Sequence, residues 1–188
     1  ISFKGIKRRL NKIIDNNRII IYEDFAHHPT AIQATIDTIK EMNHNIPILH
    51  CQDLSNNTSY RSIHQSKYPD ALKNADEIVF KMNPRYDKLP EINRLNLYNL
   101  NLSLSPRLFY YSDKNELIKE KIFSFIDKNK KCIIILSGTG NFQFLKEELI
   151  KQYNKEWAVD EKRTLKRRHL LFYLKIYDLD SNTFIGNV

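Results

Sequence analysis

The chain has 188 residues and a formal net charge of +8, a length that allows one sizeable hydrophobic core and part of a second. The positive excess lies in residues 1–18, with six Lys or Arg against one acid, and in residues 155–169, with six against three. Two basic flanks around a charge-balanced middle are not the continuous basic groove of a nucleic-acid-binding protein, so nucleic acid is not an expected partner. No apolar run reaches the roughly eighteen residues of a membrane span, so no membrane partner is expected either.

The first strong element is the run Ile19-Ile20-Ile21, which predicts a strand buried on both faces, as in a parallel sheet. A helix should follow directly, because Pro29 suits a first helical turn and Ile32, Ile36 and Ile39 recur on one face. A buried strand that leads into an amphipathic helix is typical of the start of an α/β fold.

The connection between this strand and this helix carries Asp24, His27 and His28. In open α/β sheets ligands bind at the carboxyl ends of the strands, and the free N–H groups of a helix start favour anions. The three side chains are therefore candidates for binding a phosphate or a carboxylate. The alternative is structural, with Asp24 as a turn residue and one histidine as a helix cap.

Further strands and helices alternate along the chain. Strands are expected at 46–50, 77–80, 107–112 and 132–137, with helical stretches over 68–76 and 117–126. This alternation predicts an α/β fold with a Rossmann-like, mostly parallel sheet and helices on both faces. The last strand runs into Ser137-Gly138-Thr139-Gly140, a turn in which glycine lets the backbone approach a ligand closely. Cys51 and Cys132 show no metal-ligand spacing, so reduced thiols in a cytoplasmic protein are expected.

The pattern changes after Trp157. Residues 156–169 are predicted to form a basic linker, and the apolar runs 170–178 and 183–188 flank a polar turn at 179–182. Two such runs predict a β-hairpin over 170–188. Because a lone hairpin is marginally stable in water, it would have to pack on the α/β domain to be well ordered.

Residues 24–30, Asp-Phe-Ala-His-His-Pro-Thr, resemble the motif that opens the C-terminal domain of the Mur ligases, the ATP-dependent amide-forming enzymes of peptidoglycan synthesis. Residues 3–10, Phe-Lys-Gly-Ile-Lys-Arg-Arg-Leu, resemble the arginine-bearing link between that domain and the central ATPase domain. The phenylalanine, and the Ala-Ile after the motif, are most similar to the recycling branch, which joins UDP-N-acetylmuramate to the tripeptide L-alanyl-γ-D-glutamyl-meso-diaminopimelate. The resemblance covers residues 1–155 and implies one Mur ligase C-terminal domain.

The resemblance also implies roles for individual residues. Arg9 and Asp24 would face the nucleotide, with Asp24 at its ribose. The substrate side would be formed by His27, His28, Asn57, Thr58, Ser137 and Gly138. The family's Glu-Pro-Arg-Ser-Asn-Thr is altered, because residues 52–55 are Gln-Asp-Leu-Ser and the missing arginine puts one anion contact in doubt. Residues 83–85, Asn-Pro-Arg, resemble the sequence with which diaminopimelate-adding ligases hold their amino acid, although a proline turn with a solvated arginine is the favoured alternative.

The resemblance implies a function that this chain cannot perform alone. Mur ligases activate an acceptor carboxylate with ATP and Mg²⁺, and an amine attacks the acyl phosphate. No Gly-x-x-x-x-Gly-Lys-Ser/Thr phosphate loop occurs here, and no catalytic or metal-binding residue is assigned. The expected function is a domain that binds the murein tripeptide and closes over ATP, with the UDP-binding and central ATPase domains as missing partners. Alone it is expected to be inactive and to bind no cofactor tightly.

The basic tail resembles the opening of a PilZ domain, in which an Arg-x-x-x-Arg stretch wraps cyclic di-GMP. Arg163 and Arg167 match that stretch, and fork-shaped guanidinium donors suit phosphates and guanines. The second PilZ motif, Asp/Asn-x-Ser-x-x-Gly, is absent, so the barrel would be incomplete. The alternative function is therefore a cyclic di-GMP-sensing module on an α/β scaffold. The alternative without binding is a basic linker with a lone hairpin.

Overall fold

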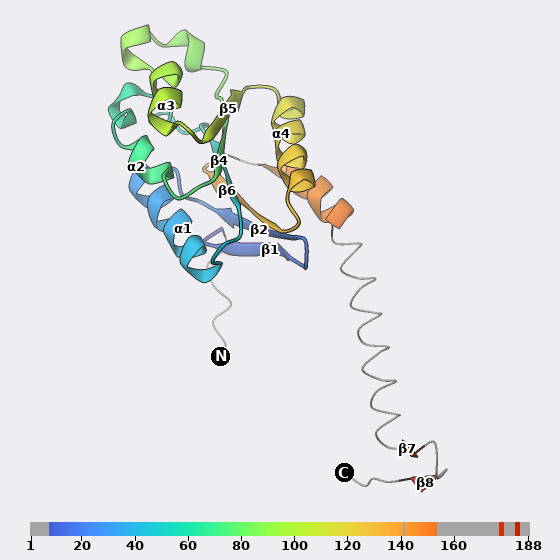
Figure 1. Cartoon of the computed structure of the whole chain (residues 1–188). Helices are drawn as coiled ribbons and strands as arrows, with labels where there is room; N and C mark the ends of the chain where they lie inside the picture. The colour runs from blue at the N-terminus through green and yellow to red at the C-terminus, as the bar shows by residue number, and fades with distance from the viewer. Residues whose placement is uncertain (1–7, 141, 154–176, 179–182, 185–188) are drawn as a thin grey trace, which may run out of the picture. The chain divides into compact units, whose positions relative to one another are not determined.

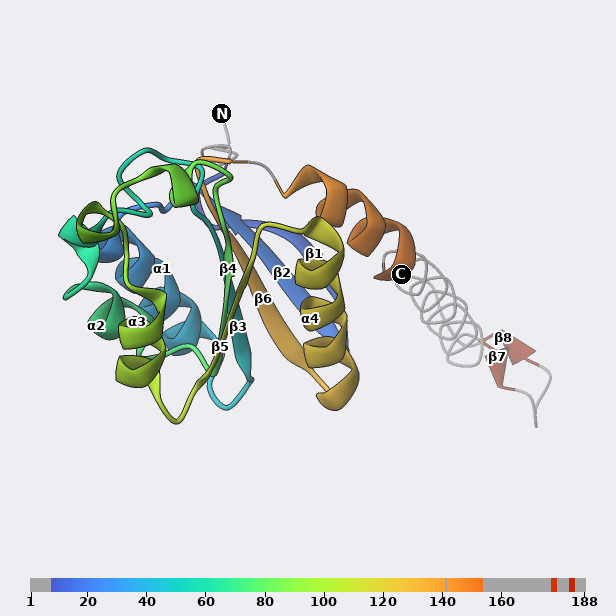
Figure 2. The same cartoon turned by 90° about the horizontal axis from the view of Figure 1, so that it is seen from above.

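A computed structural model describes residues 8–140 and 142–153 of the chain, together with the short segments 177–178 and 183–184. Two units, 1–147 and 148–188, are distinguished by their internal contacts, and each is described by itself. The first unit is built around a six-stranded sheet with helices against both faces (Figures 1 and 2). The predicted α/β class is confirmed.

The sheet has the strand order β1-β2-β6-β3-β4-β5. Within it, β2, β6, β3, β4 and β5 run parallel, and β1 pairs antiparallel with β2. The strands span Asn11–Asp15 (β1), Ile19–Asp24 (β2), Ile48–Asp53 (β3), Glu77–Lys81 (β4), Leu108–Ser112 (β5) and Cys132–Gly138 (β6). The mostly parallel sheet predicted from the sequence is therefore confirmed.

The central strands form because their side chains can be covered on both faces. Every residue of β3 and β6 is buried. The sequence predicts the second parallel strand at 46–50, but β3 begins at Ile48 and continues to Asp53. The strand starts after Pro47, because proline has no N–H to donate to a neighbouring strand. It ends later than predicted, because Gln52 and Asp53 are buried in the sheet although their polar side chains are typical of a loop.

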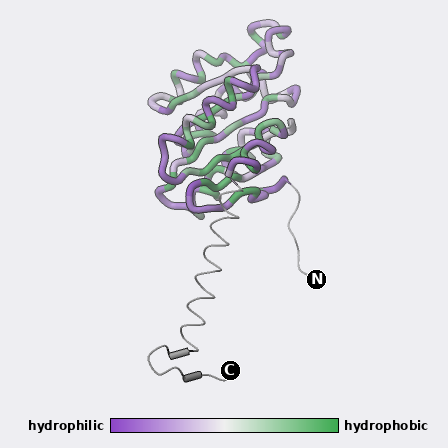
Figure 3. Tube along the Cα trace, turned by 90° about the vertical axis from the view of Figure 1, so that its right-hand side faces the viewer, coloured by the Kyte–Doolittle hydropathy of each residue, from purple (hydrophilic) through white to green (hydrophobic). Residues whose placement is uncertain are grey.

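Helices cover the two faces of the sheet unequally. One face carries α1 (Pro29–Met42), α2 (Tyr68–Leu72) and α3 (Leu97–Leu104), and the other carries α4 (Asn115–Lys128), as the view from above shows (Figure 2). Apolar residues gather along the strands and recur along the helices (Figure 3). On the three-helix face, Ile20 and Ile133 belong to one buried cluster with Ile32 and Ile36. Burial of each such side chain contributes about 1.5–3 kcal/mol.

Helix α1 begins as the sequence predicts. Pro29 is its first residue, and His28 stands before it with an extended backbone, φ −106° and ψ 139°. The His28 carbonyl accepts a hydrogen bond from the Ile32 N–H at 2.9 Å, but its imidazole makes no capping hydrogen bond. His28 thus has the backbone position of a cap, while its ring is left for other contacts.

β1 and α3 are among the elements that are not predicted from the sequence. β1 has only two isoleucines among polar residues, and it lies at the edge of the sheet with a bulge between Lys12 and Ile14. α3 has an alternation of leucine with asparagine and serine that fits a strand as well as a helix. Its helical form buries Leu97, Leu100 and Leu104, and the side chain of Asn96 caps it by accepting from the Asn99 N–H at 2.9 Å.

The second unit contains two strands, β7 (Tyr177–Asp178) and β8 (Thr183–Phe184). They pair antiparallel, with Tyr177 opposite Phe184, on either side of the predicted turn. The predicted linker over 156–169, with Arg163 and Arg167, lies outside the described residues, and so does the remainder of the predicted hairpin.

Candidate functional site

Predicted site residues gather at one edge of the sheet, where the parallel strands end. Asp24 at the end of β2 is level with Ser137 of β6. Asp53 of β3 is level with Gly138 of β6 on one side and with Lys81 of β4 on the other. Four strands therefore bring polar residues to the edge at which open α/β sheets bind ligands.

Asp24 is buried, with 4% of its surface exposed, and its carboxylate is used internally. Its Oδ2 accepts a hydrogen bond from the Leu10 N–H at 2.7 Å. Its Oδ1 accepts from the Ala26 N–H at 2.8 Å and from the Thr35 hydroxyl at 3.2 Å. The carboxylate thus ties the strand-to-helix connection to α1 and to the segment before β1. This is the structural alternative that the sequence left open, and the ribose contact stays a prediction.

The two histidines of the connection differ in their surroundings. His27 is half-buried, and its Nδ1 lies 2.9 Å from the Phe25 carbonyl oxygen. His28 is exposed, and its ring meets the buried ring of His64 edge to face, with 4.5 Å between centroids. Burial lowers the pKa of His64, and the nearby His28 and Lys67 lower it further. His28 is therefore the more accessible imidazole, next to a histidine that stays neutral at pH 7.

The loop after β3 presents Asn57 and Thr58, both of them exposed. Asn56 shapes this loop, because its Oδ1 accepts from the N–H and the hydroxyl of Thr58 at 2.9 Å each. The Asn57 carbonyl accepts from Arg61 Nε at 2.9 Å. Ser55, which stands where the family's arginine would be expected, is exposed and carries no positive charge.

The turn after β6 is packed closely against β3. Gly138 has a φ of +132°, and a Cβ placed on it would lie 2.7 Å from the Asp53 carbonyl oxygen. A Cβ on Gly140 would collide with the Asp53 carboxylate, whose Oδ2 lies 3.7 Å from Lys81 Nζ. Ser137 is buried, and among the described residues its hydroxyl has no hydrogen-bond partner. The backbone of β3 and the positive φ therefore require glycine at position 138, whereas a Cβ at position 140 would meet side chains only.

His50 and Gln52 form a buried polar pair on β3, just before its carboxyl end, and this pair was not predicted from the sequence. His50 Nε2 is 3.1 Å from Gln52 Oε1, and Gln52 Nε2 donates to the Ala26 carbonyl at 3.3 Å. Both side chains are fully buried, and burial lowers the pKa of His50 to about 4. The pair links β3 to the strand-to-helix connection through neutral groups. Polar residues inside a fully buried strand give no signal in one sequence that separates them from loop residues.

The two adjacent arginines before β1 have different environments. Arg9 is exposed, and its guanidinium carbon lies 5.6 Å from the centroid of the Phe25 ring. Arg8 turns toward the sheet edge, where its Nη2 donates to the carbonyls of Gly138 at 2.7 Å and Gly140 at 2.8 Å. Arg9 is predicted from the sequence as a site residue and Arg8 is not, because a pattern does not show which of two neighbouring arginines points inward.

Sequence comparison finds relatives that match part of the chain. The UDP-N-acetylmuramate–L-alanyl-γ-D-glutamyl-meso-2,6-diaminoheptandioate ligase of Haemophilus influenzae is 37% identical over 84 residues, which are 44% of this chain and 18% of that protein. The UDP-N-acetylmuramate–L-alanine ligase of Caldicellulosiruptor bescii is 49% identical over 41 residues, 22% of this chain and 9% of that protein. The chain thus spans less than a fifth of either relative. No family model matches it.

Solved structures share the fold. A murein peptide ligase from Psychrobacter arcticus aligns with a TM-score of 0.61 and 24% identity, over 80% of this chain and 30% of that one. A domain from a putative UDP-N-acetylmuramate:tripeptide ligase of Haemophilus ducreyi aligns with a TM-score of 0.58 and 21% identity, over 76% of this chain and 98% of that one. The chain is related to the Mur ligases. Both comparisons are consistent with a Mur ligase C-terminal domain, as the motif at 24–30 predicts.

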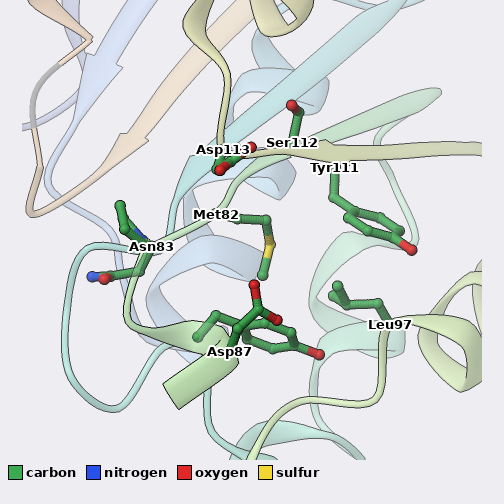
Figure 4. Close-up of a pocket in the computed structure, with 9 residues that line it drawn as sticks. Met82, Asn83, Asp87, Leu97, Tyr111, Ser112 and Asp113 are labelled. Atoms are coloured by element: carbon green, nitrogen blue, oxygen red, sulfur yellow. The ribbon is translucent and has the colours of Figure 1, made fainter. Parts of the chain in front are cut away.

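A pocket of about 360 Å³ opens in this Mur ligase fold where β4 and β5 end (Figure 4). Its walls combine apolar and aromatic side chains with polar groups, and they include two carboxylates but no Lys or Arg. The lining residues are Met82, Asn83, Pro84, Tyr86, Asp87, Leu97, Tyr111, Ser112 and Asp113. Arg85, of the Asn-Pro-Arg sequence that resembles the family's amino-acid contact, is not among them. Such a pocket suits a ligand with an apolar chain and a positively charged end.

The described residues of this Mur ligase relative contain no group of three or more His, Cys, Asp and Glu that could hold a metal ion. Among the helices of the same ranges, none is long and apolar enough to cross a bilayer. Cys51 and Cys132 are free and buried, and burial raises the pKa of both thiols, that of Cys132 to about 11. Both thiols therefore stay protonated and unreactive near neutral pH.

Proposed function

We propose that this chain is the C-terminal domain of an ATP-dependent ligase that joins UDP-N-acetylmuramate to L-alanyl-γ-D-glutamyl-meso-diaminopimelate in peptidoglycan recycling. The observation that carries the proposal is the position of the Asp-Phe-Ala-His-His-Pro-Thr motif, which stands at the carboxyl end of β2 and starts α1. The Haemophilus influenzae relative supports it, because the name of that enzyme contains this acceptor and this peptide.

The peptide would bind to the exposed polar groups of the sheet edge. His28, Asn57 and Thr58 are exposed there, and they suit amide and carboxylate groups. The turn at Ser137 and Gly138 would let the peptide approach the backbone. The pocket after β4 and β5 would take the side chain of the third residue, with its ammonium group facing Asp113, because the carboxylate of Asp87 already pairs with Arg94 at 3.4 Å.

The nucleotide would meet this edge through Arg9. Its guanidinium is exposed beside the Phe25 ring, and arginine stays charged and matches the geometry of phosphate oxygens. Asp24 fits a ribose less directly, because its carboxylate already accepts three hydrogen bonds from the chain. When bound, ATP supplies the phosphoryl group that activates the acceptor carboxylate. Mg²⁺ would accompany ATP, and no residue of this chain is assigned to it.

Ligase activity would require parts that this chain does not include. It spans less than a fifth of its curated relatives and has no phosphate-binding loop. The chain alone is therefore expected to produce no amide bond. The intact enzyme would act in the cytoplasm, where ATP is available.

The test joins the chain to the UDP-binding and ATPase domains of the Haemophilus influenzae relative. ATP-dependent product formation is followed by mass spectrometry with UDP-N-acetylmuramate and either the tripeptide or L-alanine. We expect the tripeptide product from the fusion and none from the chain alone. His28→Ala should lower the rate, whereas His44→Ala serves as the matched control, because His44 lies beyond the end of α1.

Three outcomes would contradict the proposal. Product from the isolated chain would refute the need for the other domains. Product with L-alanine alone would assign the chain to the other branch represented among its relatives. A folded fusion that makes no product with either amine would remove the ligase function altogether.

A further inference from the structure

Arg8 is buried more deeply than its neighbour Arg9 and has a distinct set of contacts. Its Nη2 donates to two carbonyl groups of one turn, those of Gly138 at 2.7 Å and Gly140 at 2.8 Å. These carbonyls are 130 and 132 residues away in sequence. One guanidinium nitrogen therefore joins the segment before β1 to the turn after β6.

The backbone of the turn is constrained on the opposite side as well. Gly138 has a left-handed φ of +132°, and Asp53 leaves no room for a Cβ on Gly138 or Gly140. The turn thus lies between the end of β3 and the Arg8 side chain. Its conformation depends on two kinds of contact, close packing against Asp53 and hydrogen bonds from Arg8.

Arg8 is itself held in place by several groups. Its Nε lies 3.6 Å from Glu23 Oε1, and Glu23 also pairs with Lys146 at 2.9 Å. Its guanidinium carbon lies 5.2 Å from the centroid of the Phe25 ring. The Arg8 carbonyl accepts from the Phe25 N–H at 2.9 Å, in a backbone with φ 58° that a residue with a side chain rarely adopts. An arginine keeps a left-handed backbone conformation only where its surroundings fix it. Here the fixing contacts come from the connection between β2 and α1, which carries the motif at 24–30.

We propose that Arg8 is a positioning residue, which holds the turn at 138–140 in the conformation that meets the substrate, while the adjacent Arg9 faces the nucleotide. We call the two hydrogen bonds from Arg8 to the carbonyls of Gly138 and Gly140 the clamp. What the turn binds rests on the proposed function, but the clamp is a property of the chain itself. Its consequence is that the segment before β1 and the turn after β6 move together.

The clamp is tested on the chain as it exists, by NMR of the Gly138 and Gly140 amides. Arg8→Met should shift both amide signals and raise their hydrogen-exchange rates at least tenfold. Arg9→Met is the matched control, with the same change of charge next to the same Phe25 ring, and should leave both glycines unchanged. Arg8→Lys keeps the charge but replaces the planar guanidinium by an ammonium on a shorter side chain, so a partial effect is expected.

In the fusion with the ligase domains, Arg8→Met should raise the KM for the tripeptide about tenfold and change the KM for ATP less than twofold. Glycine amides that respond equally to Arg8→Met and Arg9→Met would overturn the clamp. If Arg8→Met does not fold, Arg8→Lys compared with Arg9→Lys decides the question by the same signals. If the Gly138 and Gly140 amide signals change in Arg8→Met but not in Arg9→Met, and the fusion makes no tripeptide product, the clamp is retained and the proposed function is rejected.

Discussion

Replacing Asp24 by alanine should destabilise the domain strongly. The buried carboxylate accepts hydrogen bonds from two backbone N–H groups at 2.7 and 2.8 Å and from a hydroxyl at 3.2 Å. Hydrogen bonds to a charged acceptor contribute about 1.5–3 kcal/mol each, and the third is long, so the expected loss is about 3–5 kcal/mol. That is a fifth or more of the free energy of unfolding of a typical domain, which is about 5–15 kcal/mol.

The assay is urea denaturation of the chain followed by far-ultraviolet circular dichroism. At a typical slope of about 2 kcal/mol per M urea, the midpoint for Asp24→Ala should fall by about 2 M. Asp15→Ala is the control, because Asp15 is exposed on β1 and forms a surface ion pair with Lys12, so the expected loss is below about 1 kcal/mol. A loss below about 1 kcal/mol for Asp24→Ala, with a raised KM for ATP in the fusion, would refute the structural role and assign the carboxylate to the nucleotide.

Three further predictions concern other parts of the site. The pKa of His50 is about 4 in the folded chain and about 6.5 in the unfolded chain, so the free energy of unfolding should fall by about 2 kcal/mol between pH 7 and pH 5. The urea midpoint of His50→Leu should depend less on pH in this range, and an equal pH dependence of the two proteins would contradict the burial of His50 as the cause. Gly138→Ala should cost at least about 2 kcal/mol in the same denaturation, because of its φ of +132° and the contact with Asp53; an unchanged midpoint would mean that the turn can relax. Asp113→Asn should weaken tripeptide binding by the fusion about two- to fivefold by calorimetry, whereas exposed Asp70→Asn should have no effect; equal effects would place the third residue elsewhere.

The parts of the fold predicted from the sequence are those with strong apolar patterns. Ile19 to Ile21 and Cys132 to Leu136 are buried on both faces, so an uninterrupted apolar run was enough to identify them. β1 was not predicted, because a strand at the edge of a sheet needs few apolar residues and so gives a weak pattern. Helix α3 was not predicted, because the spacing of its leucines fits the period of a strand as well as that of a helix.

The site was predicted as a set of positions, but its internal contacts were not. Asp24, Ser137 and Gly138 do meet at the carboxyl edge, because parallel strands align their ends. That the Asp24 carboxylate faces Leu10, and that Arg8 faces Gly138, depends on contacts between residues far apart in sequence. The roles of Arg9, His27, His28, Asn57 and Thr58 toward ligands stay predictions.

The antiparallel direction of β1 has a consequence for how an intact enzyme would be tethered. Asn11, where β1 starts, lies opposite Glu23 at the carboxyl end of β2. The described chain therefore enters β1 beside the carboxyl edge of the sheet, and a catalytic domain joined through this segment would be attached within a few residues of the ligand site proposed there. A tether this short gives an effective concentration on the order of millimolar or more, so closure over a substrate would need little affinity between the domains themselves.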